Sequence, residues 1–137
     1  MISDERHDAD RDLEATLGIN PEFFQQVPDY LLPMEWESFK RLQLSDQTAI
    51  PPKYKELIGL AVSGATRCRY CVHFHAEAAR LNGATEEEIT ETALMAKHTM
   101  GWSTYLNTIG YDYDQFVTEF DQIAAHFRAQ QAAAAPA

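Results

Sequence analysis

Residues 53–83 have the sequence KYKELIGLAVSGATRCRYCVHFHAEAARLNG, which contains the clearest helix signals of the chain. Its first part, residues 53–63, is apolar around most of a helical circumference, which predicts a helix buried on several sides. A break at residues 64–67 precedes a second predicted helix over residues 68–81. Asn82-Gly83 then supplies the left-handed turn that ends a helix. The stretch therefore predicts a helical hairpin.

Helix-start signals predict further helices on both sides of this hairpin. Asn20-Pro21 is typical of an N-cap followed by proline at the first helical position, and Thr85-x-x-Glu88 is a capping box. A last amphipathic helix follows Gly110. The other predicted helices span residues 20–27, 33–44, 53–63, 68–81 and 85–109.

The sequence contains no alternating polar and apolar run with β-branched residues, which is the signal of a strand. The predicted fold is therefore all-α, a small bundle of about six helices built around the hairpin. Several of these helices are apolar on more than one face. Because such faces need cover, we expect the bundle to assemble as an oligomer.

The length and composition fit one domain. The chain has 137 residues, and 45% of them are hydrophobic, which is more apolar material than a disordered chain carries. Residues 1–19 are predicted to form an acidic amino-terminal arm, either solvated or a frayed helix. Residues 20–130 are predicted to form a single all-helical domain, and residues 131–137 a flexible tail.

Charge and hydropathy exclude several kinds of partner. Asp and Glu outnumber Lys and Arg by 21 to 11, and the formal net charge is -10. Because this charge repels a phosphate backbone, no nucleic acid is expected as a partner. The longest apolar run, residues 57–62, is far shorter than the roughly 20 residues that span a membrane. Residues 1–12 are acidic where a signal peptide is basic and then apolar. We expect a soluble, cytoplasmic protein with no membrane partner.

The chain has two cysteines, Cys68 and Cys71, which lie three positions apart, and His75 follows four residues later. On a helix this spacing places all three side chains along one stripe. A lone C-x-x-C in a reducing compartment indicates redox chemistry or a metal site. If the pair opens a helix, the unsatisfied amide groups there favour the thiolate. His75 can then take the proton that a thiol loses.

Glu56 lies in the apolar first helix of the hairpin, twelve residues before Cys68. A carboxylate buried there is costly without a partner. The turn at residues 64–67 lets the first helix fold back and bring the carboxylate beside His75. The sequence thus predicts a relay in which Glu56 orients and charges the imidazole, and the imidazole moves protons for the thiols.

Two other roles for the cysteines stay open at this point. They are two buried thiols that fill space, or the ligands, with His75, of a structural zinc ion. Three short side chains spread over about 10 Å of helix axis converge poorly on one ion. No metal is therefore expected.

The pattern of Glu56, eleven residues, then Cys68-x-x-Cys71-x-x-x-His75 resembles a known active-site signature. It is similar to that of the alkylhydroperoxidase D-like branch of the carboxymuconolactone decarboxylase superfamily, and the resemblance spans about residues 51–110. It implies an all-helical subunit that assembles as a trimer or hexamer. It also implies that Cys71 attacks peroxide, that Cys68 is the resolving thiol, and that Glu56 and His75 form the proton relay.

The same resemblance implies that no cofactor is bound. In that family an external dithiol such as a dihydrolipoyl group regenerates the thiols, and the partner is often a peroxiredoxin. One position departs from the pattern, because the best-studied members have a histidine immediately before the second cysteine and this chain has Tyr70. A phenol donates a hydrogen bond but does not carry a proton near neutral pH.

The sequence therefore predicts an enzyme, an alkylhydroperoxidase-like thiol-dependent peroxidase or disulfide oxidoreductase. Its expected substrate is a peroxide or a disulfide, and a lipoyl-bearing protein is an expected partner. Two alternatives stay open. One is a carboxymuconolactone decarboxylase-like enzyme that works by histidine acid–base chemistry. The other is a non-enzymatic, redox-sensing oligomer whose dithiol changes an interface.

Overall fold

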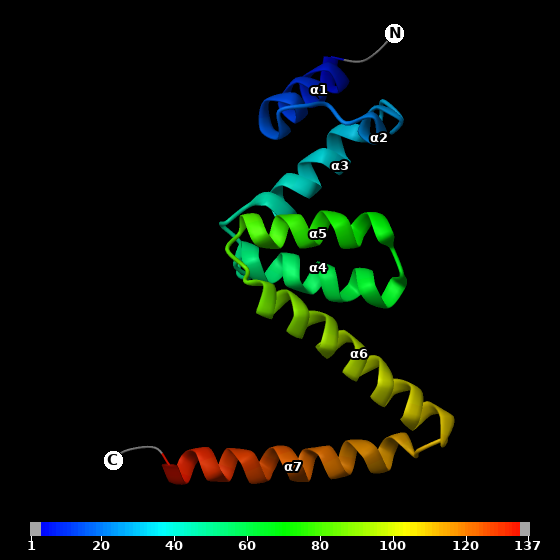
Figure 1. The fold of residues 1–137 in the computed structure, drawn as a ribbon, viewed down its shortest axis with the longest axis vertical. Coiled ribbons are helices and arrows are strands. Elements are labelled where there is room, and N and C mark those ends of the chain that lie inside the picture. Colours follow the sequence, from blue (N-terminus) through cyan, green and yellow to red (C-terminus); the bar gives the residue numbers. More distant parts are fainter. Residues whose placement is uncertain (1–3, 135–137) are drawn as a thin grey trace. The chain divides into compact units, whose positions relative to one another are not determined.

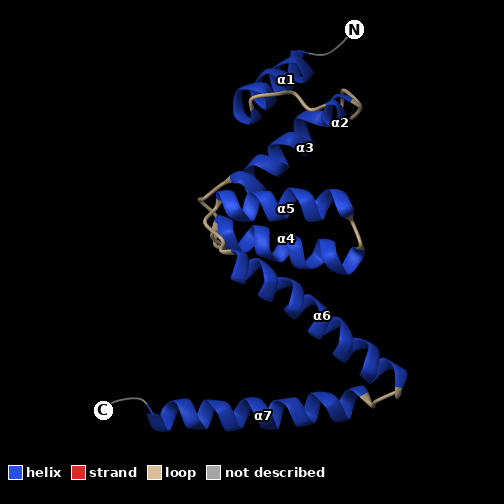
Figure 2. Cartoon of the chain, in the orientation of Figure 1, coloured by secondary structure: helices blue, strands red, loops and turns tan. Residues whose placement is uncertain are grey.

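The computed structural model describes residues 4–134, which form helices joined by loops and turns and contain no strand (Figure 2). The all-α fold predicted from the sequence is confirmed. The chain divides into two compact units, Met1–Ala93 and Leu94–Ala137. The elements are α1 (Asp4–Leu17), α2 (Glu22–Gln25), α3 (Leu32–Phe39), the π-helix η1 (Lys40–Leu44), α4 (Pro52–Thr66), α5 (Arg69–Leu81), α6 (Glu86–Thr108) and α7 (Tyr113–Ala134).

Helices α4 and α5 form the predicted hairpin and lie side by side (Figure 1). Helix α4 ends at Thr66, and its C-cap Arg67 has a left-handed backbone with φ of 58°, within the break that the sequence predicts at residues 64–67. The amide of Cys68 donates to the Ser63 carbonyl at 3.0 Å, which closes the end of α4. Cys68 is at the same time the N-cap of α5. The turn is therefore so short that the end of α4 and the start of α5 share it.

Helix α1 packs against α3 around a small apolar core of Ala9, Leu13, Leu32 and Trp36. Leu13 and Leu32 are fully buried. The solvated arm or frayed helix predicted for residues 1–19 is therefore wrong for the described part, which is a packed helix. Although the segment is acidic, Ala9 and Leu13 lie four positions apart and therefore on one face of α1. This face is enough to pack against α3.

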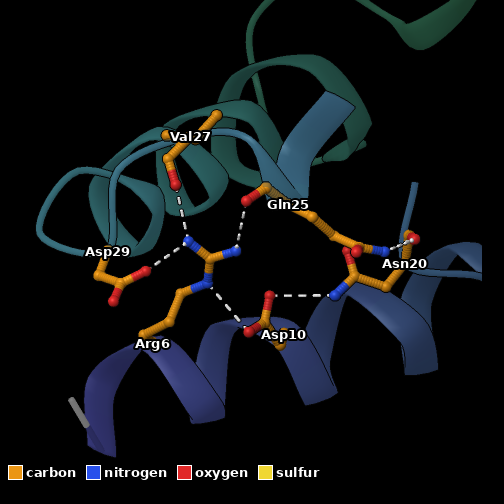
Figure 3. Close-up of polar contacts among 6 residues, drawn as sticks. All are labelled: Arg6, Asp10, Asn20, Gln25, Val27 and Asp29. Atoms are coloured by element: carbon orange, nitrogen blue, oxygen red, sulfur yellow. Dashed lines mark hydrogen bonds and ion pairs between the residues drawn. The ribbon is translucent and has the colours of Figure 1, made fainter. Parts of the chain in front are cut away.

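A buried arginine ties α1 to the chain that follows it (Figure 3). Arg6 donates to the carboxylates of Asp10 and Asp29, and to the backbone carbonyls of Gln25 and Val27. These bonds satisfy a guanidinium that is only 5% exposed. They fix the segment between α1 and α3, because the two carbonyl acceptors belong to the end of α2 and to the turn that follows it.

Helix α6 begins with the predicted capping box. The amide of Glu88 donates to the Thr85 hydroxyl at 3.1 Å, and the amide of Thr85 donates to the Glu88 carboxylate at 2.8 Å. Residues 131–134, which the sequence assigns to a flexible tail, belong to α7, and the rest of that tail lies outside the described residues. Among the described helices, none has the length and hydropathy needed to cross a membrane.

Candidate functional site

Glu56 lies on the face of α4 that is covered by α5 and η1, and it is only 2% exposed. Both oxygens of its carboxylate have partners. Oε2 lies 2.8 Å from Nδ1 of His75, and Oε1 accepts a hydrogen bond from Nε2 of Gln43 at 2.6 Å. A carboxylate is stable in such a position because each oxygen has replaced water by a hydrogen-bond donor. The predicted contact between Glu56 and His75 is present.

The imidazole of His75 lies directly over the backbone of α4 at Gly59. A side-chain Cβ built on Gly59 would come within 2.3 Å of Cε1 of His75. No other residue type leaves this volume empty, so the glycine makes room for the ring. The ring is only 17% exposed, and the buried carboxylate is on its Nδ1 side.

Cys68 and Cys71 are joined in a disulfide at the first turn of α5. Cys68 is the N-cap, and its sulfur accepts a hydrogen bond from the backbone amide of Cys71 at 3.2 Å. The start of a helix has unpaired amides and a partial positive charge, which stabilise a negatively charged sulfur. Neither sulfur titrates while the disulfide is formed. A thiolate at either position therefore exists only in the reduced form.

A hollow of about 1040 Å³ lies beside Cys71 and His75, which are both on its wall. Much of the remaining wall is aromatic or aliphatic, including Phe24, Phe39 and Phe74. Phe39 and Phe74 contact each other, with their ring centroids 6.0 Å apart. A sulfur and an imidazole at the edge of an apolar hollow can meet a substrate that has an apolar body.

The structure brings Glu56 and His75 into contact and places Cys71 and His75 on the wall of one hollow. Sequence reasoning missed Gln43 and Gly59. A glycine inside an apolar helix, three residues after Glu56, is a signal of close approach that points to Gly59. Gln43 has no such signal, because it comes from a separate helix. Among the described residues, no group of three or more His, Cys, Asp or Glu side chains is arranged to hold a metal ion.

The sequence model of the carboxymuconolactone decarboxylase family matches residues 27–111, which is more than half of the chain. The chain belongs to this family. The chain is also similar to the crystal structure of the alkylhydroperoxidase AhpD core from Rhodospirillum rubrum, with a TM-score of 0.71 and 26% sequence identity. That match covers 83% of this chain and 86% of the other. The chain is thus an AhpD-like member of the family.

A curated relative, uncharacterized protein 4 in cox locus of Paracoccus denitrificans, is 35% identical over 57 residues. The match covers 42% of this chain and 51% of that protein, so the chain matches about half the length of this relative. Family and structural neighbour together support an enzyme of the alkylhydroperoxidase or carboxymuconolactone decarboxylase type.

Proposed function

We propose that the protein is a thiol-dependent peroxidase or disulfide oxidoreductase that uses Cys68 and Cys71 as its dithiol. The observation that carries this proposal is the placement of the disulfide at the start of α5, one helical turn before an imidazole that is held by a buried carboxylate. A structural disulfide does not need an imidazole beside it. A dithiol that gains and loses protons in each cycle needs a group that accepts and returns those protons.

In the proposed cycle the thiolate of Cys71 attacks one oxygen of a hydroperoxide, and the O–O bond breaks. The sulfur becomes a sulfenic acid, and the leaving alkoxide takes a proton to depart as an alcohol. The Cys68 thiolate then attacks the sulfenic sulfur, the disulfide forms, and hydroxide leaves with a proton as water. An external dithiol such as a dihydrolipoyl group reduces the disulfide by exchange and is itself oxidised to a disulfide.

The Glu56–His75 pair supplies the protons for this cycle. With its Nδ1–H donated to Glu56 Oε2, the imidazole keeps Nε2 for the proton that it takes from a thiol and returns to the leaving oxygen. The carboxylate stabilises the imidazolium that exists between these two transfers. Tyr70 is 80% exposed and lines the hollow, and the proposed relay assigns it no proton transfer.

The apolar wall of the hollow favours an organic hydroperoxide over hydrogen peroxide as the substrate. A peroxiredoxin in its disulfide form is a further substrate consistent with the same exchange chemistry. We propose a homo-oligomer in the cytoplasm as the working form, with a lipoyl-bearing protein as the source of the reducing dithiol.

The test is consumption of cumene hydroperoxide with dihydrolipoamide as the reductant. Cys71→Ser should abolish turnover, because the attacking sulfur is gone. Glu56→Gln should lower kcat/KM by about 100-fold, the usual size of a general acid–base contribution. Glu77→Gln is the matched control, since this carboxylate pairs with Arg80 on the surface of α5. Full activity in both Cys71→Ser and Glu56→Gln would exclude the mechanism.

The family match supports a second candidate, a carboxymuconolactone decarboxylase-like enzyme in which His75 acts as the acid or base on a small carboxylated lactone. This chemistry needs no sulfur. Turnover of such a lactone by the double variant Cys68→Ser, Cys71→Ser would therefore establish it, and the loss of all turnover in that variant would rule it out.

A further inference from the structure

We propose that Gln43 is a positioning residue for the Glu56–His75 pair, an inference that rests on the proposed function. Its Nε2 donates to Glu56 Oε1 at 2.6 Å, while Glu56 Oε2 faces His75 Nδ1 at 2.8 Å. The carboxylate is therefore held from both sides. One partner is the group that moves protons, and the other is an amide that does not titrate.

The geometry explains why the relay needs this amide. A carboxylate held at one oxygen rotates about its last side-chain bond, and the second oxygen, if unpaired, competes for the same imidazole. Gln43 fixes the plane of the Glu56 carboxylate, so that Oε2 stays on the Nδ1 side of His75. Because the amide of Gln43 only donates in this contact, it neither accepts the relayed proton nor adds a charge.

The backbone of η1 is itself held against α4 next to Glu56. Lys55, the residue before Glu56, donates from Nζ to the carbonyls of Leu42 and Ser45 at 2.6 Å each. The two carbonyls are at the end of η1, on either side of Gln43 and Leu44. The backbone on both sides of Gln43 is thus bonded to Lys55, the residue that precedes Glu56.

The π-helical backbone sets the direction in which Gln43 points. The amide of Ser45 donates to the carbonyl of Lys40, five residues earlier, at 3.0 Å. A turn with this wider spacing rotates the residues at its end relative to a continuous α-helix from α3. Short π-helical turns occur often at functional sites, and here the turn delivers a side chain to the buried carboxylate.

The test compares Gln43→Met, which removes the donor at similar volume, with Gln47→Met. Gln47 is the matched control because it is exposed and its amide bonds to Asp46 rather than to the site. We expect Gln43→Met to lower kcat for cumene hydroperoxide about tenfold at an unchanged KM, the size typical of a lost hydrogen bond to a charged group. Gln47→Met should match the wild type.

A second readout does not depend on turnover. In ¹⁵N-labelled, disulfide-bonded protein, the Nδ1 proton of His75 should exchange with solvent at least tenfold faster in Gln43→Met than in the wild type. Should the wild type lack peroxidase activity, the proposed function fails, and this exchange rate alone decides the role of Gln43. Unchanged exchange and unchanged kcat in Gln43→Met would overturn the inference.

A third variant guards against loss of the fold. Lys55→Met keeps the Gln43 amide but releases the end of η1. We therefore expect a lower kcat and a faster exchange of the His75 Nδ1 proton, with both changes smaller than in Gln43→Met. If circular dichroism shows that Gln43→Met is unfolded, Lys55→Met takes its place. Wild-type exchange and kcat in a folded Lys55→Met would then overturn the inference.

Discussion

Gly59 determines where the imidazole of His75 can lie. A methyl group at Gly59 would overlap the ring, at 2.3 Å from Cε1, so Gly59→Ala forces the imidazole away from Glu56. We expect kcat/KM for cumene hydroperoxide to fall by about 100-fold, as in a variant without the relay. The fold should be kept, because the displaced atoms are the end of one side chain and alanine favours the helix by about 1 kcal/mol.

Gly64→Ala is the control for this variant, since nothing lies within 4 Å of the added methyl group. It should retain full activity and gain stability in a urea titration. Equal activity of Gly59→Ala and Gly64→Ala would show that the position of His75 does not matter for turnover.

The sequence predicts a side-chain contact only where one residue is costly to bury without a particular kind of partner. Glu56 is a charge inside an apolar helix, and that cost predicts its contact with His75. Gln43 carries no charge, and its amide can form hydrogen bonds with water or with many other groups, so the sequence does not predict its partner. Its contact depends on a π-helical turn, and π-helices have no sequence signal comparable to a cap.

The junction between the hairpin and α6 is held by an ion pair that responds to pH. Nζ of Lys53 donates to Glu88 Oε1 at 2.8 Å. The Lys53 ammonium, with help from the Thr85 amide, lowers the pKa of Glu88 below its ordinary value of 4.5. The stability from this lowered pKa is therefore present above pH 4.5 and is lost as the pH falls through the folded-state pKa.

Lys53→Met should thus lower the melting temperature at pH 7. The difference in melting temperature from the wild type should narrow when both proteins are measured near pH 3, below the ordinary Glu pKa of 4.5. The exposed Lys97 supplies the control, because Lys97→Met removes the same charge away from this pair. A gap of constant size at the two pH values would show that Lys53 acts through packing instead.

Helix boundaries are predictable where a local signal fixes them, as Thr85 and Glu88 do at the start of α6. The break before α5 is also predictable, although nothing in the sequence identifies Arg67 as its left-handed residue. Helix α1 was misjudged, because its stability comes from tertiary contacts. Leu13 and Arg6 become buried only when α3 and the segment before it are in place.

Helices α6 and α7 leave many apolar side chains exposed on a single chain. No residue of α6 or α7 over their described lengths is buried. Phe116, Phe120, Ile123 and Phe127 are spaced to lie on one side of α7, and all are exposed. An exposed apolar stripe of this kind on a long helix is typical of an interface, and we propose that further copies of the chain cover it.

A single chain with this stripe exposed would be prone to associate, so we predict that the protein sediments as a trimer or hexamer, at a multiple of the 15.5 kDa chain mass. The formal charge of -10 on each chain opposes this assembly, and added salt should strengthen it by screening. Phe120→Asp places a charge in the apolar stripe and should shift the mass towards that of one chain, as measured by sedimentation equilibrium.

Ala125→Asp is the matched control, because it adds the same charge to an exposed position on the other side of α7. It should leave the mass unchanged.

The same measurement, made with the Cys68–Cys71 disulfide formed and then reduced, separates two roles of the dithiol. A peroxidase cycle requires no change of assembly, whereas a redox sensor works only if the mass or the shape of the oligomer changes with the disulfide. A wild-type mass of one chain at both low and high salt would contradict the assembly, and the apolar stripe of α7 would then need another kind of partner.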